Sequence, residues 1–192
     1  MLKKSIESSI ENLSKVLQDP ELLKSVESAI QVLVSAILAR KPVLVCGNGG
    51  SASDALHITG ELVGRFNFDR HAMNVICLNS NVTVLTAWSN DKSFETVFSR
   101  QVEAHGSSGG VLWALSTSGN SPNVIEAVQE AKRQNMTTIV MTGFSSGKIG
   151  GQADLLIASP GSDAPSAQNV HVVIYHLICQ EVERRVTEKL EQ

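Results

Sequence analysis

The spacing of apolar residues along the chain predicts strands and helices that alternate. Short apolar runs bounded by glycine, proline or polar residues are typical of strands buried on both faces of a sheet. Between these runs, apolar residues recur every three or four positions, which is the period of an amphipathic helix. We therefore expect an α/β fold in which helices flank a five-stranded parallel sheet. The predicted strands are residues 43–46, 74–78, 111–115, 137–141 and 155–158.

Capping and turn residues indicate where the helices between these strands begin. Ser51 or Ser53 is expected to cap the helix that follows the first strand, and Pro122 suits the first position of a later helix. Further helices are predicted over residues 83–88, 93–104, 122–134 and 166–190. The expected apolar faces are Phe94, Val97, Phe98 and Val102 in the second of these, and Val170, Val173, Ile174, Leu177 and Ile178 in the last.

Two more amphipathic helices precede the first strand, which is more than one α/β layer requires. Apolar residues recur at helical spacing from Ile6 to Leu17 and from Val26 to Ile37, and Asp19-Pro20 separates the two helices. We interpret residues 1–40 as a helical arm and residues 41–192 as the α/β core of a single domain. The first helix is expected to pack on another subunit of an oligomer, and the alternative is that it folds back on its own domain.

Composition and charge exclude several classes of protein. The chain has 192 residues, of which 42% are hydrophobic and 18% charged, and its formal net charge is −3. This weak negative charge gives no electrostatic reason to bind nucleic acid or an anionic membrane. No apolar run is long enough to span a bilayer, and the N-terminus lacks the apolar segment of a signal peptide. Because Cys46, Cys77 and Cys179 lie far apart in apolar runs, we expect buried, reduced thiols in a cytoplasmic protein.

Two turns that follow predicted strands contain groups that bind anions. Gly47-Asn48-Gly49-Gly50-Ser51 joins a strand to a helix, and glycines there let backbone N–H groups approach a ligand. Ser116-Thr117-Ser118-Gly119-Asn120-Ser121 follows the third strand and carries four hydroxyls without a charge. Hydroxyl and N–H groups at a helix start can hold a phosphate, although the same residues also form ordinary capped turns. Both turns would lie at the carboxyl ends of strands, where α/β sheets bind ligands, and they could meet on one phosphorylated ligand.

Side chains suited to acid–base or metal chemistry lie on two of the predicted helices. His57 and Glu61 are four residues apart and share one helix face. They could ligate a metal or act as a base with an orienting partner, and the alternative is a surface ion pair. The last helix places Gln168 and His176 roughly on one side, with His171 between them. A histidine in an apolar helix face is more often a core residue than a catalyst, so spacing alone leaves both interpretations open.

Five segments occur in a characteristic order: Cys46 to Ser51, His57-x-x-x-Glu61, Asn90-Asp91, Ser116 to Ser121 and Gln168-x-x-His171-x-x-x-x-His176. Together they resemble the phosphoheptose isomerases of the sugar-isomerase (SIS) domain family. The serine-rich turn is a feature of SIS domains in general, whereas the combination of His57, Glu61, Gln168 and His176 is more specific. The resemblance covers nearly the whole chain and implies a single, flavodoxin-like SIS domain with two N-terminal helices.

The resemblance implies an aldose–ketose isomerase that converts sedoheptulose 7-phosphate to D-glycero-D-manno-heptose 7-phosphate through an enediol. This is the first step toward nucleotide-activated heptose for lipopolysaccharide and other surface polysaccharides. The resemblance also implies a cytoplasmic homotetramer with one zinc ion per subunit, held by His57, Glu61, Gln168 and His176. Glu61 would be the catalytic base and His176 the acid, roles that suit a carboxylate and an imidazole near neutral pH. The implied substrate-binding residues are Asn48, Gly49, Gly50, Glu61, Asn90, Asp91, Ser116, Thr117, Ser118, Ser121 and Gln168.

One segment departs from the family pattern, and two alternative functions stay open. The family usually has Arg-Ile-Gln-Glu ahead of the last helix, whereas this chain has Pro165-Ser166-Ala167-Gln168-Asn169, with its acid at Asp163. An isomerase of another phosphosugar is therefore one alternative. The other is a non-catalytic SIS tetramer that binds the bacterial replication initiator protein, because such a relative shares the pattern from Leu78 to Asp91. The presence of Glu61 and His176 favours the enzyme.

Overall fold

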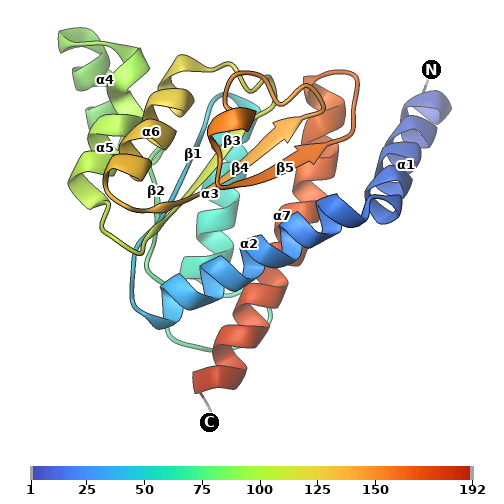
Figure 1. Ribbon diagram of the computed structural model, residues 1–192, viewed down its shortest axis with the longest axis horizontal. Coiled ribbons are helices and arrows are strands. Elements are labelled where there is room, and N and C mark those ends of the chain that lie inside the picture. Colours follow the sequence, from blue (N-terminus) through green and yellow to red (C-terminus); the bar gives the residue numbers. More distant parts are fainter. Residues whose placement is uncertain (1, 191–192) are drawn as a thin grey trace.

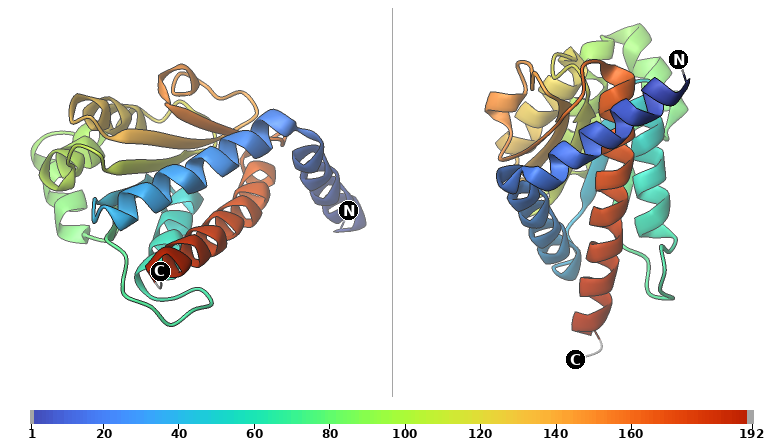
Figure 2. Two further views of the ribbon diagram at one scale, coloured as in Figure 1. Left: turned by 60° about the horizontal axis from the view of Figure 1, so that its bottom comes forward. Right: turned by 90° about the vertical axis from the view of Figure 1, so that its right-hand side faces the viewer.

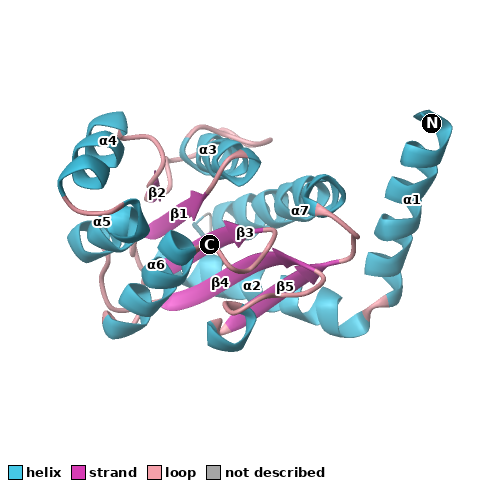
Figure 3. Cartoon of the chain, turned by 90° about the horizontal axis from the view of Figure 1, so that it is seen from above, coloured by secondary structure: helices cyan, strands magenta, loops and turns pink. Residues whose placement is uncertain are grey.

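The computed structural model describes residues 2–190 and contains a five-stranded parallel sheet between two layers of helices (Figure 1, Figure 3). The strand order is β2-β1-β3-β4-β5, which is the flavodoxin-like order and confirms the predicted fold class. All five strands were predicted from their apolar runs. Their bounds are β1 Val43–Gly47, β2 Val75–Cys77, β3 Val111–Ser116, β4 Thr137–Gly143 and β5 Leu155–Ser159.

The predicted helices are all present, with small shifts at their ends. The helix expected over residues 93–104 is divided into the 3₁₀ turn η1 and the helix α5, and the last helix begins two residues earlier than expected. The bounds are α1 Leu2–Gln18, α2 Pro20–Leu38, α3 Gly50–Val63, α4 Val82–Asp91, η1 Phe94–Thr96, α5 Val97–His105, α6 Pro122–Arg133, η2 Gly150–Gln152 and α7 Ala164–Leu190.

Alternate residues of each central strand face opposite helix layers. In β1, Val43 and Val45 belong to the core shared with α2, α3 and α7, whereas Leu44 and Cys46 belong to the core shared with α5 and α6. The strands are continuous apolar runs in the sequence because helices cover both faces of the sheet. The three cysteines are buried free thiols, as expected.

Three residues of the expected apolar faces are exposed. Val173 and Leu177 of α7 are 39% and 52% exposed, and Phe94 of η1 is 53% exposed, so the prediction that they are buried is wrong for the single chain. Only one side of α7 packs against α2 and α3, so its apolar stripe is wider than the surface available to cover it.

Helix α1 extends away from the body of the molecule (Figure 2). Its only buried residues within the described part of the chain are Asn12 and Val16, and its contacts are with α2 and the N-terminal part of α7. The Asn169 amide donates to Ser9 Oγ over 3.4 Å. The apolar residues Ile6 and Ile10 of α1 are 54% and 59% exposed, so α1 does not fold back to bury its apolar face on its own domain. No helix within residues 2–190 is long and apolar enough to cross a bilayer.

Candidate active site

The turn between β1 and α3 provides free backbone donors at the carboxyl edge of the sheet. Helix α3 starts at Gly50, and Gly49 occupies the N-cap position with a φ of 57° and no side-chain cap. The prediction that Ser51 or Ser53 caps this helix is therefore wrong, because a glycine with positive φ turns the chain into the helix earlier. The N–H groups of Gly49 and Gly50 have no hydrogen-bond partner within residues 2–190, which leaves them available to an anion.

The hydroxyl-rich turn after β3 lies beside this glycine turn. Strands β1 and β3 are neighbours in the sheet, with Gly47 opposite Leu115, so the turns that follow them lie at the same edge. The side-chain amides of Asn48 and Asn123 exchange two hydrogen bonds of 2.8 and 2.9 Å, which join the glycine turn to the start of α6. The structure therefore brings the two polar turns together, as expected.

A cavity of about 350 Å³ opens between the hydroxyl-rich turn and the loops that follow β4 and β5. Within the turn, the Ser116 hydroxyl donates to Ser121 Oγ over 3.2 Å. Hydroxyl groups from three loops line the cavity, together with the Asp163 carboxylate and the apolar Phe144 side chain. Such hydroxyl groups can form hydrogen bonds with a polyhydroxylated ligand. The hydroxyl groups on its wall belong to Thr117, Ser118, Ser145 and Ser162.

Helices α3 and α7 pack side by side (Figure 3). Their packing brings together the side chains of two histidines and a glutamate. His57 Nε2 lies 3.0 Å from Glu61 Oε1 and 3.4 Å from His176 Nε2. Ligand atoms of these three residues lie within 4.8 Å of one another, a spacing at which one metal ion could contact all three. The side chains of His57 and Glu61 are 46% and 23% exposed, so a ligand can reach the cluster from solvent.

A tyrosine and an aspartate lie behind His57, and sequence reasoning did not identify either. The Tyr175 hydroxyl lies 3.0 Å from His57 Nδ1 and 3.5 Å from Asp54 Oδ1. Burial raises the pKa of Asp54 despite its contacts with Tyr175 and His57. Burial, and then the Asp54 carboxylate, raise the pKa of Tyr175 above its usual range, so the phenol stays neutral. The position of Asp54 one helical turn before His57 is the only sequence signal for this arrangement.

A buried carboxylate on α7 holds the loop that follows α3, and sequence reasoning missed it as well. Glu183 is fully buried and accepts hydrogen bonds from the Phe66, Asn67 and Phe68 N–H groups over 2.6–3.2 Å and from Arg70 Nε over 3.1 Å. Burial raises the pKa of Glu183, but these backbone N–H groups and Arg70 outweigh it, so the pKa lies below its usual value. Glu183 thereby fixes a loop of otherwise irregular structure.

This loop reaches the histidine–glutamate cluster at two points. Arg70 Nη2 donates to the backbone carbonyl of Glu61 over 3.0 Å, and the ring centroid of Phe66 lies 6.0 Å from that of His176. By holding this loop in place, Glu183 helps to position the Glu61 backbone and the His176 ring without touching either.

Gln168 lies over the glycine turn, in the second turn of α7. A Cβ added at Gly50 would overlap the Gln168 side-chain amide, so this amide can lie against the turn only while residue 50 is glycine and would have to move otherwise. Gln168 precedes His176 by eight residues, which is about 12 Å along a helix axis. The structure thus places Gln168 beside the glycine turn, and its role as a fourth metal ligand stays a prediction.

Asp163, the acid of the atypical segment, caps the start of α7. Its carboxylate accepts a hydrogen bond from the Ser166 N–H over 2.9 Å, and its backbone carbonyl accepts one from the Ala167 N–H. Hydrogen bonds from Ser166 lower the pKa of Asp163, which keeps the cap ionised.

Asn90 and Asp91 lie at the end of α4, which packs mainly on η1 and α5. The Asn90 amide donates to Asp91 Oδ1 over 2.9 Å. Among the described residues, no hydrogen bond, ion pair or ring contact joins either side chain to the His57 cluster. Their predicted role in binding substrate hydroxyls is therefore not supported by a contact within this chain.

His171 belongs to the core. It is fully buried, and its Nε2 donates to the Thr142 carbonyl over 3.0 Å, which ties α7 to β4. Burial lowers the pKa of His171, so the ring is neutral. Its Nδ1 has no hydrogen-bond partner among residues 2–190.

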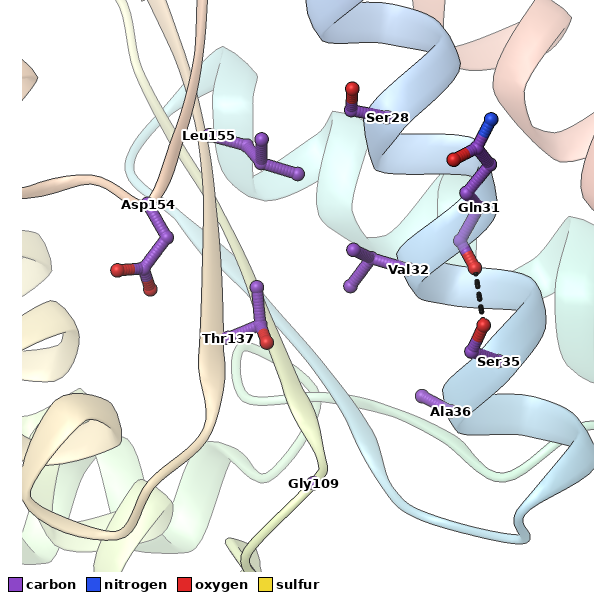
Figure 4. Close-up of a pocket in the computed structure, with 9 residues that line it drawn as sticks. All are labelled: Ser28, Gln31, Val32, Ser35, Ala36, Gly109, Thr137, Asp154 and Leu155. Carbon is purple, nitrogen blue, oxygen red and sulfur yellow. Dashed lines mark hydrogen bonds between the residues drawn. The ribbon is translucent and has the colours of Figure 1, made fainter.

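A second cavity lies at the opposite, N-terminal end of the strands (Figure 4). It has a volume of about 550 Å³ and is formed by α2, Gly109 and the starts of β4 and β5. Its one acidic group, Asp154, already accepts from the Thr138 backbone and hydroxyl over 2.8 and 2.7 Å, and the carboxylate points away from α2. None of the predicted site residues lines this cavity.

Known proteins share both the sequence and the fold described above. The SIS domain model matches residues 6–143. Phosphoheptose isomerase of Clostridium acetobutylicum is 40% identical over 185 residues, covering 96% of this chain and 94% of the relative. Phosphoheptose isomerase of Citrifermentans bemidjiense is 45% identical over 166 residues, covering 86% of each chain.

A solved structure agrees with these relatives. Phosphoheptose isomerase from Neisseria gonorrhoeae superimposes with a TM-score of 0.89 at 33% identity, over 95% of this chain and 97% of that chain. Sequence and fold are thus shared over nearly the full length of both proteins. The chain therefore belongs to the phosphoheptose isomerase family of SIS-domain proteins.

Proposed function

We propose that this chain is the aldose–ketose isomerase that converts sedoheptulose 7-phosphate to D-glycero-D-manno-heptose 7-phosphate, in the cytoplasm, as the first step of nucleotide-activated heptose biosynthesis. Membership of the phosphoheptose isomerase family supports this reaction. The observation that carries the proposal is the cluster of His57, Glu61 and His176, which combines a carboxylate and an imidazole at a solvent-accessible point between α3 and α7.

Glu61 and His176 have the chemistry that the isomerisation requires. Moving the carbonyl from C2 to C1 requires a base to remove a proton from C1 and an acid to return a proton to C2, through an enediol. We assign the first role to the Glu61 carboxylate and the second to the His176 imidazole. Both groups contact the His57 ring, so one bound sugar can reach both.

The donor set of the cluster fits zinc. Two imidazole nitrogens and a carboxylate oxygen are ligands that zinc prefers, and they leave a position open to a substrate. His57, Glu61 and His176 would hold the ion, with Gln168 as the predicted fourth ligand. When bound, zinc would polarise the substrate oxygens and so ease removal of the neighbouring proton.

The two polar turns are proposed to hold the phosphate and hydroxyl groups of the sugar. The glycine turn offers the N–H groups of Gly49 and Gly50 beside the Asn48 amide, and Gln168 lies over it. The hydroxyl-rich turn offers Ser116, Thr117, Ser118 and Ser121 beside the 350 Å³ cavity. In one chain, Asn90 and Asp91 lie elsewhere, so their proposed role depends on another subunit.

A homotetramer is proposed because the single chain leaves apolar surface uncovered. Helix α1 exposes a row of apolar side chains, and α7 exposes Val173 and Leu177. Covering such surfaces with a second copy of the chain removes them from water at about 25 cal/mol for each Å² buried. The exposed apolar residues of α1 are Leu2, Ile6, Ile10 and Leu17.

The test is direct: purified protein is incubated with sedoheptulose 7-phosphate, with and without added zinc, and aldoheptose phosphate is followed by NMR. We expect conversion that zinc increases. Glu61→Gln and His176→Gln should each abolish conversion while leaving phosphosugar binding intact, and Glu103→Gln and His105→Gln, on the exposed surface of α5, serve as matched controls. Near-normal turnover in either site variant would remove that residue from the mechanism.

The same assay, repeated with other phosphosugars, decides between the alternatives. Conversion of a different phosphosugar would identify another isomerase of this fold. Absence of conversion of any sugar by folded protein would favour the non-catalytic tetramer that binds the replication initiator protein.

A further inference from the structure

Two side chains behind the cluster extend from His57 in a chain of contacts that ends in a buried carboxylate. Tyr175 is 1% exposed, and its hydroxyl lies between His57 Nδ1 at 3.0 Å and Asp54 Oδ1 at 3.5 Å. Asp54 is 9% exposed, and its Oδ2 has no hydrogen-bond partner among residues 2–190. Tyr175 is the only tyrosine in the sequence, and it directly precedes His176. The roles proposed above for the site do not use Tyr175 or Asp54.

The position of one proton on His57 decides whether the ring can ligate a metal. A neutral imidazole carries its proton on one nitrogen and a lone pair on the other. In the structure, Nε2 lies 3.0 Å from Glu61 Oε1, a contact that places the proton on Nε2 and leaves Nδ1 to accept from the Tyr175 hydroxyl. A metal on Nε2 requires the opposite tautomer, in which Nδ1–H donates to the Tyr175 oxygen.

The Tyr175 hydroxyl has a single hydrogen, and this makes Asp54 necessary. When Tyr175 accepts from His57 Nδ1–H, its own hydrogen must turn to another acceptor. Asp54 Oδ1 is within reach, and a buried hydroxyl without an acceptor would cost free energy. Asp54 therefore allows Tyr175 to accept a hydrogen bond from His57.

We propose that Asp54 and Tyr175 are positioning residues that accept the Nδ1–H of His57 when Nε2 binds a metal ion, and so stabilise the metal-binding tautomer. The proposal deepens the proposed function, on which it rests only in taking His57 as a metal ligand. A metal-bound histidine commonly donates its other N–H to a carboxylate or carbonyl, and loss of that partner weakens metal binding about 10–100-fold. Here the tyrosine hydroxyl stands between the ring and the carboxylate.

The first test is the zinc affinity of the full chain, measured by competition with a chromophoric chelator at constant pH. Tyr175→Phe keeps the ring packing and is expected to weaken zinc binding by about 10–100-fold. Asp54→Leu is expected to have a similar effect, whereas Asp54→Asn, which retains an acceptor oxygen, should cost less. Because the two residues act through one another, the Tyr175→Phe/Asp54→Leu double variant should be no weaker than the single ones. Thr138→Val removes a buried hydroxyl far from the cluster and serves as the control.

The second test reads the tautomer itself. The ¹⁵N chemical shifts of the ring nitrogens of all five histidines are measured by NMR in ¹⁵N-labelled protein. The His57 signals are those that disappear in the His57→Gln variant. We expect His57 to carry its proton on Nε2 without metal and on Nδ1 with zinc. Unchanged zinc affinity in Tyr175→Phe, or a wild-type chain that binds no zinc, would overturn the proposal. An inactive wild-type chain whose zinc affinity still falls in Tyr175→Phe would refute the proposed reaction and leave this inference standing.

Discussion

Replacing Glu183 by glutamine tests how far the loop that follows α3 depends on one buried charge. The substitution keeps the shape of the side chain and replaces one carboxylate oxygen with an NH₂ group. In the native protein, Oε1 accepts from Phe66 N and Arg70 Nε, and Oε2 accepts from Asn67 N and Phe68 N. Whichever way the glutamine amide is oriented, one pair of donors then faces another donor.

The expected loss of stability follows from the burial of the partner. The Arg70 side chain is 4% exposed, so glutamine leaves its guanidinium charge buried without a counter-charge. Removing one partner of a buried ion pair typically costs about 3–5 kcal/mol. This cost is a large fraction of the free energy of unfolding of a folded domain, which is typically about 5–15 kcal/mol. We therefore expect the free energy of unfolding to fall by about 3–5 kcal/mol.

The assay is urea unfolding followed by circular dichroism at one protein concentration, because assembly would make stability depend on concentration. Glu188→Gln is the matched control: it lies on the same helix and pairs with Arg184 over 2.6 Å, but its side chain is 54% exposed. We expect no measurable change for this exposed pair. A loss below about 1 kcal/mol for Glu183→Gln would refute the reasoning, because it would show that the loop does not depend on this charge.

Three further predictions follow from the geometry. Gly50→Ala should push the Gln168 amide away from the glycine turn and raise the KM for the phosphosugar more than it lowers kcat, and an unchanged KM would contradict this placement. Burial lowers the pKa of His171 in the folded protein, so the unfolded chain takes up a proton first as pH falls below about 6.5. In urea titrations below that pH, the free energy of unfolding of the wild type should therefore fall by up to about 1.4 kcal/mol per pH unit more than that of His171→Gln. Equal pH dependence of the two proteins would count against this role of His171. Ile6→Glu combined with Ile10→Glu should reduce the mass measured by light scattering, and an unchanged oligomer would show that this face of α1 is not an interface.

Local sequence patterns were sufficient for the strands, for most helices and for part of the site. The central strands are continuous apolar runs because helices cover both faces of the sheet, and this burial leaves a direct mark on the sequence. His57 and Glu61 were placed together by their separation of four residues, which fixes a shared helix face in any α-helix. The meeting of the two polar turns followed from the rule that parallel strands end at one edge.

Other features had no local signal. The start of α3 depended on the left-handed conformation of Gly49, which let the helix begin before either serine. The exposure of Val173 and Leu177 depended on how much of α7 the other helices cover, and periodicity does not report this. Asn90 and Asp91 fit a family pattern, but the packing of α4 kept them from the cluster within one chain.

The sequence alone thus determined the order of elements, the parallel sheet and the residue types available for chemistry, because these depend on spacing over a few positions. Tertiary structure decided which of these residues meet. His57 is 118 positions from Tyr175, and Phe66 is 117 positions from Glu183. Such pairs are set by the packing of α7 against α3 and its loop, which no local pattern encodes.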